Sequence, residues 1–135
     1  MQVPAITASY LGVLALIYAF LSIRVVRLRG KYQVSFGDGD NATLKSAIRS
    51  HAHFAEYVPL IVLMIALLEM AGTAPARLHV LLGALLLARI LHPLGMSAAP
   101  RTLRFRLFRV GGVAITFLLL VSCAVALLLR FVVHG

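Results

Sequence analysis

The chain has 135 residues, 61% of them hydrophobic, and carries 13 Lys and Arg against 4 Asp and Glu, for a formal net charge of +9. A one-domain chain of this composition lacks the polar surface of a water-soluble protein, but it is long enough for four bilayer-spanning helices of about 20 residues each. Its basic residues flank apolar runs, where contact with anionic headgroups is favoured over nucleic-acid binding.

The first apolar run has no charged residue from Met1 to Ile23 and predicts a span over about residues 3–29. Basic residues follow this run rather than precede it, and no small-residue cleavage site is evident. We therefore interpret the run as a retained helix and not as a secretory signal.

A polar linker over about residues 33–43 follows the first run. Asp38 and Asp40 resemble the start of a calcium-binding loop, but an alanine stands where a third ligand belongs and no glutamate closes the loop. We interpret the linker as a turn that ends in a helix N-cap at Asn41 or Thr43.

Three further spans are predicted over about residues 42–71, 76–97 and 102–132, all within one domain of residues 1–135. The second contains Pro59, which membrane bundles tolerate inside a helix. The last contains the single cysteine, Cys123, whose uncharged neighbours favour a packing role over a catalytic one. Short connections make consecutive helices antiparallel, so the expected fold is an all-α, up-down-up-down four-helix transmembrane bundle.

Basic residues are distributed unequally between the two ends of this predicted bundle. The first and third connections, with their flanks, hold ten of them, whereas the other end has only Arg77 and Arg130. The positive-inside rule therefore places the first and third connections in the cytosol and both termini across the membrane.

The two middle spans differ from the outer ones because they carry ionisable side chains inside their apolar runs. Arg49, His53 and Glu56 share one helical stripe, and Arg89 and His92 lie on another with Met96. A charge facing lipid costs several kcal/mol, so these groups should turn toward protein or water. If the stripes face each other, they form a polar cleft at the basic end.

Simpler interpretations exist for parts of this pattern. Glu56 and Arg89 could neutralise each other between helices, and a single buried histidine is usually a helix contact. No metal site is expected, because the histidines lack an H-E-x-x-H arrangement and no suitable cysteine is present.

The segment from Arg49 to Pro59 resembles the second-helix signature of the MAPEG family, the membrane-associated proteins of eicosanoid and glutathione metabolism. Arg49, Glu56, Tyr57 and Pro59 fit this signature, whereas His53 replaces an asparagine. The residue stretches 25–29, 37–39 and 88–92 resemble the bacterial branch of the family, so the resemblance covers nearly the whole chain.

The resemblance implies a homotrimer in the bacterial inner membrane, with glutathione bound as co-substrate between subunits near the cytosolic side. By position, the glutathione contacts are Arg29, Arg49, His53, Glu56, Tyr57 and His92. Met96 stands where members of the family often carry a tyrosine. The thiol-activating arginine maps best to Arg104, with Arg101 and Arg106 as alternatives.

This implied site is chemically consistent with glutathione, which has two carboxylates and one ammonium group. Arginines and one carboxylate are the complementary set. A free thiol has a pKa of about 8.5, and a nearby guanidinium favours its nucleophilic thiolate form. The implied function is a glutathione transferase or peroxidase that acts on a small lipophilic substrate arriving from the membrane lipids, without metal or nucleic acid.

Parts of the sequence are consistent with two other functions. The departures at His53 and Met96 raise the alternative of a non-catalytic lipid-binding or scaffold member of the same family. A small multidrug exporter would also use four short helices, but it needs a carboxylate in its first helix, and this chain has none there.

Overall fold

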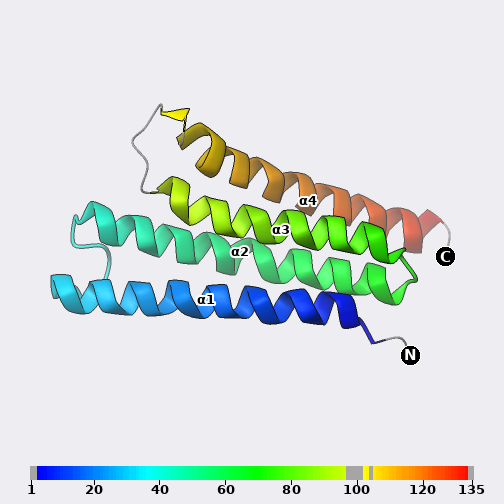
Figure 1. The fold of residues 1–135 in the computed structure, drawn as a ribbon, viewed down its shortest axis with the longest axis horizontal. Helices are drawn as coiled ribbons and strands as arrows, with labels where there is room; N and C mark the ends of the chain where they lie inside the picture. The colour runs from blue at the N-terminus through cyan, green and yellow to red at the C-terminus, as the bar shows by residue number, and fades with distance from the viewer. Residues whose placement is uncertain (1–2, 97–101, 104, 134–135) are drawn as a thin grey trace.

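A computed structural model describes residues 3–96, 102–103 and 105–133 (Figure 1). Its helices are α1 (Ala5–Tyr32), α2 (Ala42–Met70), α3 (Pro75–Met96) and α4 (Gly111–Leu128), with short π-helical segments η1 (Phe105–Val110) and η2 (Leu129–Val133) at the two ends of α4. No strand occurs among these described residues. Both chain termini lie at one end of the bundle, and the α1–α2 loop and η1 lie at the other (Figure 1). The predicted up-down-up-down arrangement is confirmed.

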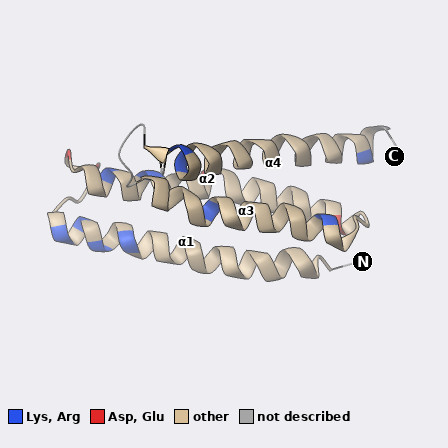
Figure 2. Cartoon of the chain, turned by 45° about the horizontal axis from the view of Figure 1, so that its top comes forward, with Lys and Arg blue, Asp and Glu red and all other residues tan. Residues whose placement is uncertain are grey.

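Within the residues that the structure describes, four helical stretches are long and apolar enough to cross a membrane, which makes the chain an integral membrane protein. Lys and Arg concentrate at the end that carries the α1–α2 loop and η1, and few lie at the end with the termini (Figure 2). The unequal distribution of charge in the sequence is therefore an unequal distribution between the two ends of the folded chain.

The α1–α2 loop uses its polar residues for its own structure. The Asn41 side chain accepts a hydrogen bond from the Leu44 amide at 3.0 Å, so Asn41 is the N-cap of α2, one of the two predicted positions. Lys45 lies 3.6 Å from the Asp38 carboxylate. Gly37 has a φ of +64°, a conformation that glycine adopts without steric cost.

Close backbone contacts hold α3 against α4 and η1. A Cβ atom on Gly112 would lie 3.3 Å from the Ala88 carbonyl oxygen, and one on Gly95 would lie 2.8 Å from the carbonyl carbon of Phe108. Small residues permit such contacts, which in a bilayer replace the hydrophobic effect as a source of helix association. Gly95 thereby sets how closely η1 lies on the end of α3.

The start of α1 is capped by a residue from another helix. Pro4 offers no side-chain cap, and the Glu69 carboxylate near the end of α2 takes its place. It accepts hydrogen bonds from the Ile6 amide at 2.9 Å, the Thr7 amide at 2.8 Å and the Thr7 hydroxyl at 2.6 Å. A carboxylate at this position satisfies free amides and complements the helix dipole.

Candidate functional site

The polar stripes of α2 and α3 meet through their histidines. The His53 and His92 rings pack edge to face with centroids 5.0 Å apart. His53 also stacks on Tyr57 at 5.9 Å, and Tyr57 contacts the Phe117 ring of α4 at 5.5 Å. The two stripes therefore face each other at this point, and a row of four rings crosses from α3 over α2 to α4.

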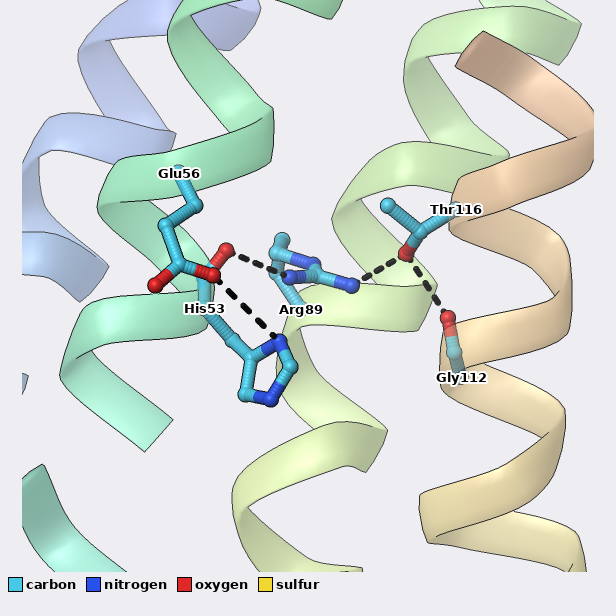
Figure 3. Close-up of polar contacts among 5 residues, drawn as sticks. All are labelled: His53, Glu56, Arg89, Gly112 and Thr116. Carbon is cyan, nitrogen blue, oxygen red and sulfur yellow. Dashed lines mark hydrogen bonds and ion pairs between the residues drawn. The ribbon is translucent and has the colours of Figure 1, made fainter. Parts of the chain in front are cut away.

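Arg89, on α3, connects three helices through its hydrogen bonds (Figure 3). It is only 3% exposed and donates to the backbone carbonyl of His53 at 3.4 Å and to the Thr116 hydroxyl. Thr116 in turn donates to the Gly112 carbonyl at 2.7 Å. The buried guanidinium therefore joins α3 to α2 and α4 through uncharged acceptors.

Glu56 does not neutralise Arg89. The two form no ion pair, and the Glu56 carboxylate instead lies 3.9 Å from Nδ1 of His53. The interpretation of Glu56 and Arg89 as an interhelical ion pair is wrong, because the Arg89 side chain turns toward Thr116 on α4 (Figure 3).

Hydrogen-bonding capacity remains unused beside Arg89. Nε of Arg89 and both ring nitrogens of His92 are buried and have no hydrogen-bond partner among the described residues. Since buried polar atoms are nearly always hydrogen-bonded, these groups leave capacity for a further polar partner beside Arg89.

The charges around His53 are mostly positive. They come from Arg49, Arg89 and Arg109, opposed by Glu56. Arg49 and Arg109 are exposed at the surface of the chain, and the Glu56 side chain is 52% exposed although it lies near the middle of α2. Such a set suits a ligand that carries more than one anionic group and one cationic group.

Arg29, the remaining predicted glutathione contact, has its hydrogen-bond partners in the α1–α2 loop. Arg29 donates to the carbonyls of Val34 and Ser35 in the α1–α2 loop, at 3.4 and 3.1 Å. Met96 ends α3, where its carbonyl accepts a hydrogen bond from Ser46. Arg106 is exposed on η1. Arg101 and Arg104, two candidates for thiol activation, lie outside the described residues.

Three residues of this region were missed as site residues in the sequence. Thr116 binds Arg89, Phe117 packs on Tyr57, and Arg109 acts on the histidines from η1. Apart from Ser122, Thr116 is the only residue of α4 with a hydroxyl side chain, and this is the only sequence signal for its contact with Arg89.

Fold and site together define a four-helix integral membrane protein with a polar, net positive site among α2, α3 and α4. The sequence matches the MAPEG family over residues 7–125, and the chain belongs to that family. The inner membrane protein YecN of Escherichia coli K12 is 37% identical over 90 residues, which are 67% of this chain and 69% of YecN. YecN of Escherichia coli O6:H1 aligns with the same identity and coverage. No solved structure matches the chain.

Proposed function

We propose that this chain is a membrane-bound glutathione transferase or peroxidase, which activates glutathione as its thiolate for attack on lipophilic electrophiles or hydroperoxides. The observation that carries the proposal is the gathering of Arg49, Glu56, Arg89 and Arg109 around His53, inside helices that cross the membrane. Membership of the MAPEG family supports it.

Glutathione has the charges that this cluster complements. Arg49 and Arg109 would bind its two carboxylates, and Glu56 would bind its ammonium group. His92 and Nε of Arg89 offer further polar contacts. Arg29, His53 and Tyr57 would complete the glutathione site, as the family resemblance implies.

The chemistry requires a thiolate and a lipophilic acceptor. Arg104, or else Arg101 or Arg106, would stabilise the thiolate, which is the nucleophile. In a conjugation, the sulfur forms a bond to carbon and the leaving group departs with its electron pair. With a hydroperoxide, two glutathione molecules become the disulfide while the hydroperoxide is reduced to alcohol and water.

The proposed enzyme is a homotrimer with the site at the boundary between subunits. A half-exposed carboxylate such as Glu56 in the middle of a span is costly against lipid. A neighbouring subunit that covers Glu56 and Arg49 would remove this cost. Because the similar YecN is named as an inner membrane protein, we assign the chain to the bacterial inner membrane, with the α1–α2 and α3–η1 connections cytosolic and both termini opposite.

The test uses the purified protein in detergent with glutathione and a panel of lipophilic electrophiles and hydroperoxides. We expect an ultraviolet thiolate signal on mixing and measurable turnover. Arg104→Ala should lower kcat, whereas Arg27→Ala, which alters an exposed arginine of α1 outside the site, should leave it unchanged. Absence of both thiolate and turnover across the panel would contradict the proposal.

A second candidate is a non-catalytic lipid-binding member of the family, favoured by His53 in place of an asparagine and Met96 in place of a tyrosine. Alanine variants of Arg101, Arg104 and Arg106 distinguish the two candidates. If none of the three lowers the turnover measured with the unaltered protein, that turnover does not come from an arginine-activated thiol.

A further inference from the structure

A second region with unused polar groups lies at the opposite end of the bundle, beside the α2–α3 turn. A pocket of about 540 Å³ opens between the α2–α3 turn and the ends of α3 and α4, with Arg77 and Arg130 in its wall. A neighbouring pocket of about 440 Å³ shares Leu68, Arg77, Leu81 and Ala126 with it and extends along α3 and α4 to Ser122 and Cys123. The shared residues make the two pockets one continuous groove.

The groove is cationic at one end and apolar along the rest. Arg130 is held over the α2–α3 turn by a 2.8 Å hydrogen bond to the Ala71 carbonyl. The Arg77 side chain has no hydrogen bond or ion pair within the described part of the chain. The nearest acid along the sequence, Glu69, is already bound by Ile6 and Thr7 of α1. The two guanidinium groups therefore lack a carboxylate partner.

We propose that this groove binds one anionic phospholipid from the membrane leaflet at the terminal end of the bundle. The phosphate lies between Arg77 and Arg130, and one acyl chain follows α4 toward Cys123. Guanidinium groups bind phosphate oxygens through paired hydrogen bonds. The segment of α4 and η2 from Cys123 to Arg130 extends about 10 Å at the usual helical rise, so the groove accommodates part of an acyl chain.

The combination of charge and groove distinguishes this site from ordinary contact of arginines with lipid. Arginines that flank a span usually reach nearby headgroups without preference for one molecule. Here an apolar channel begins at the arginine pair, so headgroup and chain are bound together. The site lies at the end opposite the His53–His92 cluster and does not depend on the proposed thiol chemistry.

The experiment is native mass spectrometry of the full chain in detergent, titrated separately with phosphatidylglycerol, phosphatidylcholine and glycerol phosphate. We expect one phosphatidylglycerol per subunit to bind at least tenfold more tightly than phosphatidylcholine, and no retention of glycerol phosphate. The double variant Arg77→Gln/Arg130→Gln should lose this preference. Arg27→Gln, which removes an arginine at the other end, should keep it.

A second variant tests the groove without altering the arginines. Ala126→Phe fills the channel and should weaken phosphatidylglycerol binding at least fivefold, and the smaller Ala126→Leu serves if the phenylalanine variant does not fold. Unchanged binding in the double arginine variant overturns the proposal. Unchanged binding in the filled variant also overturns the proposal, because the site would then be headgroup contact alone. Retention of glycerol phosphate as strong as that of the lipid overturns it as well.

Discussion

Arg89 is buried against uncharged partners, and this arrangement determines the charge of the candidate site. Its guanidinium binds the Thr116 hydroxyl and the His53 carbonyl, so its positive charge is not cancelled by an adjacent carboxylate. Charges interact more strongly in a protein interior than in water. The charge of Arg89 therefore acts on His53 and His92 and on whatever ligand they contact.

The Arg89–Thr116 hydrogen bond should contribute to stability. Thr116→Val keeps the shape of the side chain but leaves a buried guanidinium donor without its acceptor, so we expect a loss of about 1–2 kcal/mol in the free energy of unfolding. Reversible unfolding in mixed detergent micelles measures it. Thr116→Ser retains the hydroxyl and should lose less. Equal stability of the valine variant and the unaltered protein would contradict this role.

The Glu56 carboxylate should contribute to glutathione affinity rather than to stability, since it is half exposed and 3.9 Å from its nearest partner. Glu56→Gln removes the charge that would bind the glutathione ammonium group. We expect at least a tenfold weaker Kd by calorimetry, in line with about 1.5–3 kcal/mol for a charged hydrogen bond. Asp38→Asn, in the α1–α2 loop, is the control. An unchanged Kd would remove Glu56 from the site.

At the scale of elements, contact between α3 and η1 depends on a glycine. A methyl group on Gly95 would lie 2.8 Å from the backbone of Phe108, closer than real contacts allow, so Gly95→Ala must displace η1 and with it Arg109. We expect a lower midpoint of thermal unfolding in detergent and weaker glutathione binding. Gly83→Ala, in the same helix with open space around it, should be neutral or slightly stabilising. If both variants behave alike, the close contact does not matter.

The helices were predictable from the sequence, whereas the partners of the buried polar groups were not. Apolar runs and the N-cap at Asn41 depend on neighbouring residues only, so they can be read along the chain. The contact of Arg89 with Thr116 depends on how α4 is rotated about its axis, and an almost uniformly apolar helix gives no signal for that rotation. Helical spacing predicted that His53 and Glu56 share one stripe, but it could not predict which of the two residues contacts Arg89.

At the scale of the whole molecule, the basic residues at one end predict a single orientation in the membrane (Figure 2). Alkaline phosphatase fused to the C-terminus should be active in a bacterial host, and a green fluorescent protein fused there should remain dark. Fusions placed after Asp38 in the α1–α2 loop should behave in the opposite way. A fluorescent C-terminal fusion would reverse the assignment and place both termini in the cytosol.

The contact between Glu69 and the start of α1 has a consequence for how the protein is made. Thr7 and Glu69 are 62 residues apart in the chain, so the amides that begin the first helix gain their acceptor only after the second helix has been synthesised almost completely. The carboxylate then joins the start of the first helix to the end of the second, so the position of the first span in the bilayer depends on a residue that is synthesised much later.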